Sequence, residues 1–534
     1  MQSALGGVGW RKQKKSTFAP MYIRKKKNRS GSVSVVAVSK SSGRYEEVRS
    51  FGAACTDEEV SKLYSEALHW LDTIGNQAVI DFEDKCARER EETLRVVNNM
   101  DAVLINGTQL LLNQVYDSIG FCQIKDEILR HLVAARVSQP CSKLATVEYL
   151  KSYYDEDVDL NRIYRYMDKL YKTQREQVQQ ISVEHTRRIL GGKVGVMFYD
   201  VTTLYFETAQ TDELREPGFS KDGKTAESQV VLGLLVSEGG YPLSYSLYNG
   251  KQYEGYTMIP MIDDFKQRFN LDEDIVVVAD AGLMNADNVD LLRQANYQYV
   301  IGAKIKGEKE SVKKWILQWE KKDGEFIECK RDNGERLVVG YSETRAKKDA
   351  YNRKRGVERL RRSYRSGTLT KSQVNKRGYN KFLEISKDVE VRISEERILE
   401  DVLWDGLKGY VTNTDFSAEN VVAQYWGLWV VERAFRISKG KLDMRPMFHF
   451  TEKRIEAHVC ICFVAYKVYK ELERIIAKAG IQMSVDKVLD IAKTITTVRV
   501  KMPQNDEVYT KTLFLTEQQR AIKPLFDLAG IGLG

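Results

Sequence analysis

Two short apolar segments, each ended by an aspartate, constrain the fold of this chain more than any other feature of its sequence. They cover residues 194–200 and 275–280 and end in Asp200 and Asp280. Continuous hydrophobic residues are typical of strands that are buried on both faces of a sheet. Open α/β sheets place their sites at the carboxyl ends of such strands. The pattern therefore predicts two buried strands that carry Asp200 and Asp280 to one site.

A third acidic residue, Glu432, lies in a segment whose apolar spacing predicts a long amphipathic helix over residues 417–442. Residues seven apart return to nearly the same helix face, so Tyr425, Glu432 and Lys439 share one stripe. Two carboxylates at strand ends and a third from a covering helix are hard oxygen ligands suited to two Mg²⁺ ions. Taken singly, each Asp is explained equally well as a turn residue, and Glu432 is better explained as a solvated residue on a helix surface. The hypothesis therefore rests on the three together.

Length and composition limit the class of protein. A chain of 534 residues exceeds one ordinary core and predicts two to four domains. The basic N-terminus lacks the apolar core of a signal peptide, and no apolar run approaches the roughly 18–20 residues of a membrane span. Seven scattered cysteines without a C-x-x-C pair indicate reduced thiols and no structural metal. We therefore expect a cytoplasmic protein without a membrane partner, with Met21 as an alternative start.

The periodicity changes several times along the chain and predicts an α+β or α/β multidomain fold. The expected regions are a basic leader with a β-hairpin (1–52), a helical domain (53–190), a sheet domain with C-terminal helices (191–304 and 409–534) and a basic insertion domain (305–408). For the helical domain three roles stay open: DNA binding, a linker and a dimerisation bundle. Three meandering strands followed by β-α-β units predict a mixed sheet with helices on both faces. A ribonuclease-H-like sheet has this strand order.

The insertion contains the strongest local charge of the chain. Residues 345–377 hold thirteen Lys and Arg against two acidic residues, while the whole chain has a net charge of +8. Tyr351, Tyr364 and Tyr379 are interleaved with these cations, which favours contacts with nucleic-acid phosphates over a merely solvated helix. The residues predicted to contact DNA here are Arg353, Arg355, Arg361 and Arg362.

Three segments around the acidic residues have a close family resemblance. FYDVTTLYFET, VVVADAGL and YWGLWVVERAFRISKGKLDMRPMFHF resemble the catalytic blocks of IS4-type DDE transposases, nearest the IS1634 group. The resemblance covers roughly residues 191–304 and 401–470. It implies a ribonuclease-H-like catalytic domain in which Asp200, Asp280 and Glu432 hold two Mg²⁺ ions, with Mn²⁺ as a substitute.

The resemblance also implies DNA contacts near Glu432. The family signature Tyr-x2-Arg-x3-Glu-x6-Lys falls on Tyr425, Leu428, Glu432 and Lys439, so Leu428 departs from the expected arginine. Tyr425 and Lys439 are expected to contact DNA. A neighbouring arginine is expected to replace the missing one, and the candidates are Arg433 and Arg436.

The resemblance implies the transposase of a bacterial insertion sequence. Such a protein binds double-stranded DNA at terminal inverted repeats, cleaves the element ends and joins the freed 3′-hydroxyls to target DNA. A homodimer on paired ends, in a bacterial cytoplasm and associated with the nucleoid, is expected from the family alone. Two alternatives stay open: another ribonuclease-H-like nuclease, and a non-catalytic DNA-binding protein derived from a transposase.

Overall fold

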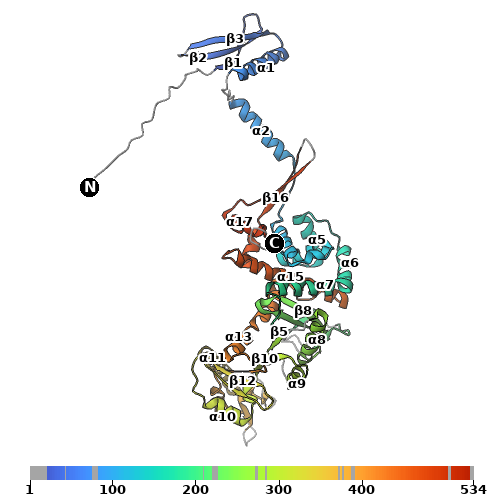
Figure 1. Cartoon of the computed structure of the whole chain (residues 1–534), viewed down its shortest axis with the longest axis vertical. Helices are drawn as coiled ribbons and strands as arrows, with labels where there is room; N and C mark the ends of the chain where they lie inside the picture. Colours follow the sequence, from blue (N-terminus) through green and yellow to red (C-terminus); the bar gives the residue numbers. More distant parts are fainter. Residues whose placement is uncertain are drawn as a thin grey trace, which may run out of the picture. The chain divides into compact units, whose positions relative to one another are not determined.

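The chain forms two compact units (Figure 1). The computed structural model describes residues 21–41, 44–74, 82–208, 210–218, 226–270, 275–282, 286–370, 373–375, 378–385, 391–502 and 507–528. Unit 1 consists of Met1–Asp101 and Val500–Tyr509, and unit 2 of Ala102–Arg499 and Thr510–Gly534. The three acidic residues singled out above all lie in unit 2.

Unit 1 contains a small antiparallel sheet covered by a helix. Its elements are β1 (Met21–Lys27), β2 (Val33–Ser41), β3 (Arg44–Ala54), α1 (Asp57–Ile74) and α2 (Phe82–Asn98). The β2–β3 pairing confirms the hairpin that the alternating patterns predict, and β1 adds a third strand. Val35 and Ala54 of the sheet pack against Val60 and Ala67 of α1, which closes a small core.

Unit 2 is built on one mixed sheet. Its strands are β5 (Val196–Tyr205), β6 (Glu216–Pro217), β7 (Ser228–Ser237), β8 (Pro242–Asn249), β9 (Val276–Ala279), β10 (Gln298–Ala303), β11 (Phe326–Lys330), β12 (Arg336–Tyr341) and β15 (Leu407–Thr412). The order is β11-β12-β15-β10-β9-β5-β7-β6, and β8 pairs with β7. β9 runs parallel to both β5 and β10, whereas β7 is antiparallel to β5. The meander β5-β7-β8 followed by the parallel strands β9 and β10 confirms the predicted mixed α/β sheet.

Helices bury the sheet on both faces, as expected for strands that are hydrophobic throughout. One face packs against α8 (Met258–Phe269), α9 (Ala286–Gln294) and α10 (Glu310–Gln318). The elements that share the core of the other face are α3 (Gly107–Ile119), α4 (Glu127–Ser138), α5 (Lys143–Tyr149), α6 (Leu160–Lys169), α7 (Arg175–Ile189), α13 (Ala418–Trp426), α14 (Trp429–Arg436), α15 (Glu452–Lys478), α16 (Val485–Ala492) and α17 (Glu517–Ile522). Over the residues described, no helix has the length and apolarity needed to cross a membrane.

The expected helical region 53–190 is divided between the two units. α1 packs on the small sheet of unit 1, whereas α3 and α4 pack against α15 in the large core of unit 2. In the sequence between α2 and α3, β4 (Met100–Leu104) pairs in a three-stranded sheet with β16 (Thr496–Lys501) and β17 (Val508–Leu513). Long-range pairing with the C-terminal strands, which local periodicity does not reveal, accounts for this difference.

Part of the expected insertion domain (305–408) belongs to the large sheet of unit 2. Its strands β11 and β12 extend the large sheet through β15, so they share the core of that sheet. The remainder comprises α11 (Glu343–Arg365), β13 (Leu383–Ile385), β14 (Val391–Ile393) and α12 (Glu395–Val402). This remainder has a small core of its own, formed by Val357, Leu360, Phe382 and Leu383.

The single helix predicted over residues 417–442 is interrupted. α13 ends at Trp426, α14 begins at Trp429, and a π-helix (Ile437–Lys441) follows. Gly427 lies at the break, where an added Cβ would come 2.4 Å from Cζ of Phe198 in β5. Only glycine permits this close approach of the helix pair to the sheet. The break therefore lets α14 pack on β5, which carries Asp200, while α13 packs over β9, β10 and β15.

Candidate active site

Strand register brings Asp200 and Asp280 together. β5 and β9 are parallel with Tyr199 opposite Ala279, so the two aspartates follow at neighbouring positions. Because side chains alternate along a strand, Asp200 shares the face of Phe198, and Asp280 that of Val278. Both of these apolar residues belong to the core that α13 and α14 also join. The aspartates therefore point to the face of the sheet that these two helices cover.

The three acidic residues line one cavity of about 240 Å³. Asp280 directly follows β9, and Glu432 comes from α14, which packs on β5. Asp200 lies in the middle of β5 and not at the predicted strand end, because pairing with β7 extends this strand to Tyr205. The other residues of the lining are Arg345, Lys408, Tyr410, Tyr425, Trp426, Leu428, Trp429 and Val431. The three acidic residues singled out from the sequence, which span more than two hundred residues of the chain, thus line the same cavity.

Asp280 is held in place by a tyrosine of α13. The Tyr425 hydroxyl donates a hydrogen bond of 2.5 Å to Asp280 Oδ1. Desolvation would raise the pKa of Asp280, but hydrogen bonds from Tyr425 and the amides of Ala281 and Gly282, together with the charge of Lys408, lower it below its ordinary value. Asp280 is therefore kept as a carboxylate, the form that binds cations.

A glycine on the next strand makes room for this tyrosine. Ala279 pairs with Ile301, so Gly302 lies beside Asp280. A Cβ on Gly302 would come 2.6 Å from the Tyr425 hydroxyl oxygen, too close to coexist with it. The ring of Tyr410 packs edge-on against Tyr425 with centroids 4.9 Å apart. Backbone and ring contacts thus fix the hydroxyl that orients Asp280.

For the DNA cleavage that the sequence predicts, we expect Tyr425→Phe to lower the rate about ten- to a hundred-fold, because a hydrogen bond to a charged group contributes roughly 1.5–3 kcal/mol. The ring packing would be kept, so only the orientation of Asp280 is lost. Single-turnover cleavage measures the effect, with Tyr410→Phe in the same cavity as the matched control. Equal rates for the two variants would show that the Tyr425 hydroxyl has no positioning role.

The other residues expected to contact DNA near Glu432 lie in different surroundings. Lys439 donates a hydrogen bond to Thr202, two residues after Asp200 on the same face of β5. Leu428 lines the cavity, at the position where the family has arginine. Of the two arginines expected to replace it, Arg433 is directed to Glu473 of α15 in an ion pair, whereas Arg436 is exposed. Arg433 is therefore committed to the helix packing.

Six residues that line the cavity were not among the predicted site residues: Arg345, Lys408, Tyr410, Trp426, Trp429 and Val431. Arg345 reaches it from α11 and Lys408 from β15, and both bring positive charge to the carboxylates. The side chains of Trp426 and Trp429 are exposed to 62% and 55% although they are large and apolar. Exposed aromatic rings beside a signature motif were a usable signal in the sequence. The two cations carried no such signal, because long-range folding alone brings them here.

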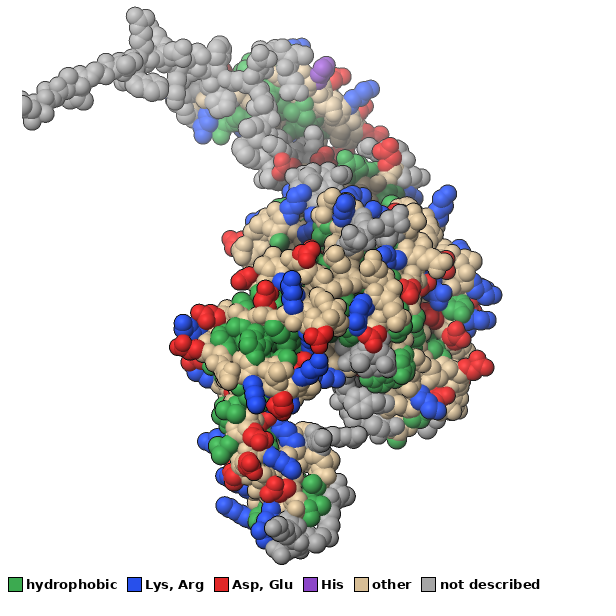
Figure 2. Space-filling model, turned by 60° about the horizontal axis from the view of Figure 1, so that its bottom comes forward, with side chains coloured by type: hydrophobic (Ala, Val, Ile, Leu, Met, Phe, Trp, Pro, Cys, Tyr) green, Lys and Arg blue, Asp and Glu red, His purple; other side chains and the backbone are tan. Residues whose placement is uncertain are grey.

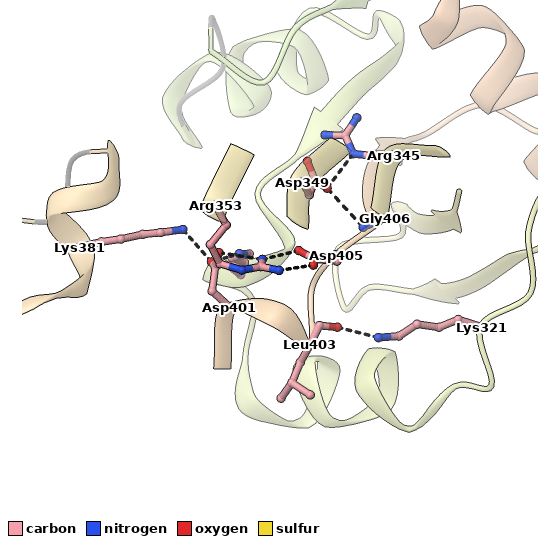
Figure 3. A network of polar contacts seen from close by, with 10 residues as sticks. Lys321, Arg345, Asp349, Arg353, Lys381, Asp401, Leu403, Asp405 and Gly406 are labelled. Carbon is pink, nitrogen blue, oxygen red and sulfur yellow. Dashed lines mark hydrogen bonds and ion pairs between the residues drawn. The ribbon is translucent and has the colours of Figure 1, made fainter. Parts of the chain in front are cut away.

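The structure corrects the role predicted for Arg353. Its guanidinium is buried between Asp401 and Asp405, with Nη1 2.5 Å from Asp405 Oδ1 (Figure 3). Lys306 and Lys381 each lie 2.6 Å from Asp401 and complete the cluster. A buried, doubly paired arginine holds α11 against the end of α12 and is not available to a DNA phosphate.

The other three predicted arginines lie on the outside of α11. Arg355 and Arg362 are exposed, and Arg361 is paired with Glu395 at 2.7 Å. The acidic residues that follow in the chain offset part of the charge, so residues 343–405 hold seventeen Lys and Arg against eleven Asp and Glu. Figure 2 likewise shows basic and acidic side chains interspersed on the face that it draws. The surface is basic but not uniformly so.

The chemistry of the cavity fits divalent cations. Its carboxylates are the oxygen donors that Mg²⁺ and Mn²⁺ prefer. Within the described ranges, no three His, Cys, Asp or Glu side chains are already close enough to hold an ion. Asp280 is engaged by Tyr425 and Glu432 is exposed. The residue types and their shared cavity therefore fit such ions, and side-chain rotations would have to bring the oxygens together.

Comparison with known proteins yields one family and several distant structures. A piggyBac transposase synaptic complex with hairpin DNA is 10% identical, with 69% of this chain and 70% of that chain covered and a TM-score of 0.37. A Mos1 paired-end complex with the left transposon end is 11% identical, with 33% and 58% covered and a TM-score of 0.15. A Mos1 mariner paired-end complex with Mn is 12% identical, with 34% and 66% covered and a TM-score of 0.15. TM-scores this low do not establish a shared fold.

The family match is the decisive comparison. No curated protein matches the chain. The family described as "Transposase DDE domain" matches residues 193–467, which is just over half of the chain and includes Asp200, Asp280 and Glu432. The chain therefore belongs to the family of DDE-domain transposases.

Proposed function

We propose that this protein is the transposase of a bacterial insertion sequence of the IS4 type, nearest the IS1634 group, with a ribonuclease-H-like catalytic sheet. It binds the terminal inverted repeats, cleaves DNA at the element ends and joins the 3′-hydroxyls to target DNA. The observation that carries the proposal is the cavity shared by Asp200, Asp280 and Glu432. The meander β5-β7-β8 followed by β9 and β10 supports the ribonuclease-H-like assignment.

The three carboxylates would hold two divalent cations, Mg²⁺ or Mn²⁺. Cleavage of a phosphodiester requires an attacking oxygen in line with the leaving oxygen and compensation of the charge around phosphorus. Bound ions supply that compensation and favour the deprotonated attacking oxygen. The chain itself contributes position: Tyr425 orients Asp280, and Lys439, anchored at Thr202, offers its charge to a phosphate next to Asp200.

Arg345 takes over the contact that the family gives to the signature arginine. Its side chain lines the same cavity as Leu428, which replaces that arginine here. Arg345 Nε lies 3.8 Å from Asp349 Oδ2, too far for a hydrogen bond, and is buried without a hydrogen-bond partner among the residues described. Figure 3 shows its two terminal nitrogens directed away from Asp349. A phosphate oxygen would satisfy this guanidinium.

The DNA contacts extend to the outer face of α11. We expect the double variant Arg355→Ala, Arg362→Ala to reduce the slope of log affinity against log salt by up to about 2, since each lost phosphate contact removes about 0.9. Arg361→Ala should have a smaller effect because Glu395 already neutralises this residue. Binding of an end fragment over a salt series measures the slope. An unchanged slope for the double variant would remove α11 from the DNA interface.

A homodimer on paired ends and a location on the bacterial nucleoid complete the proposal, and both rest on the family resemblance. The deciding experiment incubates the protein with pre-cut ends, target DNA and Mg²⁺. Joined products support a transposase. Cleavage without joining would indicate another ribonuclease-H-like nuclease, and binding without any nicking would indicate a non-catalytic DNA-binding protein.

A further inference from the structure

A second cavity of unit 2, about 200 Å³ in volume, is lined by cations instead of carboxylates. It lies between α4, α5, α15 and the loop of residues 443–449. Its charged and titratable residues are Arg136, Lys143, Asp443, Arg445, His449 and His458. No part of the proposed cleavage chemistry uses this cavity.

Two of these cations are buried without an acidic partner. Arg136 and Lys143 are each only 6% exposed. Lys143 Nζ lies 3.5 Å from His458 Nδ1, and Arg136 Nη2 donates to the carbonyl oxygen of Cys141 at 3.2 Å. Over the ranges that the structure describes, neither side chain forms an ion pair with a carboxylate, and Asp443 is the one acid in the lining. Buried charges left in this state are costly and favour an anion from outside.

The two histidines of the cavity are neutral and do not compensate the positive charges of Arg136 and Lys143. Burial, and then the positive charge of Arg136, lowers the pKa of Lys143 to about 7. Burial also lowers the pKa of His449 to about 3 and that of His458 well below its usual range. Both histidines are therefore neutral near pH 7. An anion in the cavity would stabilise the charged form of Lys143.

Two cations, Lys439 and Arg445, lie along β5 between the candidate active site and the second cavity. Along β5, Asp200 lines the first cavity, Thr202 is bonded to Lys439, and the ring of Tyr205 is covered by Arg445 at 5.5 Å. Arg445 in turn lines the second cavity. Five residues of a strand span roughly 17 Å, which corresponds to about five base pairs of DNA.

We propose that this cavity binds a backbone phosphate of DNA that extends beyond the cleavage site. Lys143 and Arg136 would hold the phosphate, while Lys439 and Arg445 follow the backbone between the two cavities. The inference rests on the proposed function. Free inorganic phosphate has the same chemistry, but the position of Lys439 and Arg445 between the two cavities favours phosphate within a DNA strand.

The test replaces Lys143 by methionine, which has similar length and no charge. Lys143→Met should weaken end binding about ten-fold and reduce the salt slope by about 1. It should leave the melting temperature unchanged or higher, because a buried unpaired charge is removed. The matched control is Lys467→Met: Lys467 is also buried, but it donates to Ser182 O at 2.9 Å and Thr186 Oγ1 at 2.5 Å. This control should lower the melting temperature and leave the salt slope unchanged.

Single methylphosphonate substitutions along the end fragment locate the contact. Wild-type protein should lose affinity at a phosphate about five base pairs from the cleaved one, and Lys143→Met should show no further loss there. The inference would be overturned if Lys143→Met bound the end fragment with the affinity and the salt slope of the wild-type protein. The inference would also be overturned if inorganic phosphate raised the melting temperature of the wild-type protein but not of Lys143→Met, while both proteins bound DNA equally well. Cleavage by wild-type protein is measured in parallel, since its absence contradicts the proposed function, whereas a missing Lys143 effect contradicts only this inference.

Discussion

Asp200→Asn is expected to reduce DNA cleavage on the order of 10³-fold or more, comparable to the loss of an essential charge-stabilising group, while binding of the element ends is retained. Asparagine keeps the size and position of the side chain but cannot offer a carboxylate to a cation. Asp280→Asn and Glu432→Gln should behave alike, because all three side chains line one cavity. Single-turnover cleavage of an end fragment, with binding measured in parallel, gives both quantities.

The matched control for these variants is Asp290→Asn. Asp290 lies ten residues beyond Asp280 on α9, is exposed and pairs only locally with Arg293. Loss of such a surface pair costs about 1 kcal/mol or less and should leave cleavage unchanged. Full cleavage by any one of the three cavity variants would remove that residue from the essential set.

Arg353→Ala is expected to have the largest effect on stability, a loss of about 3 kcal/mol in the free energy of unfolding. The substitution would remove the bidentate partner of Asp405, which is half-buried (Figure 3). Asp401 would keep its ion pairs with Lys306 and Lys381. Thermal or denaturant unfolding measures the loss. Limited proteolysis should show cleavage within residues 343–405 first, since this part has only a small core.

Arg355→Ala serves as the control on the same helix. Arg355 is exposed, and its one ring contact is with Tyr351 at 5.7 Å. A surface substitution of this kind changes stability by about 0.5 kcal/mol or less. If Arg353→Ala kept full stability and reduced only the salt dependence of DNA binding, Arg353 would be a DNA contact after all.

Local patterns in the sequence predicted the elements that carry the site. The hydrophobic runs that end in Asp200 and Asp280 form the buried strands β5 and β9, as their composition predicts. Asp200 and Asp280 could be paired in advance, since each follows a run of hydrophobic residues typical of a buried strand. The structure adds that Glu432 lines the same cavity as the two aspartates.

Features that depend on distant contacts could not be predicted. The break at Gly427 arises from its approach to Phe198, more than two hundred residues earlier. The burial of Arg353 depends on Asp401 and Asp405, which a count of charges over residues 345–377 leaves out. In the same way, Arg345 and Lys408 reach the carboxylates only because β12 and β15 extend the large sheet.

The most direct test of the shared carboxylate cavity is a Mn²⁺ titration followed by electron paramagnetic resonance, with the protein bound to a DNA end. Wild-type protein should bind up to two ions, and Asp200→Asn, Asp280→Asn and Glu432→Gln should each lose at least one of them, whereas Asp290→Asn should not. Wild-type ion binding in all three variants would contradict the assignment of these carboxylates as one cation site.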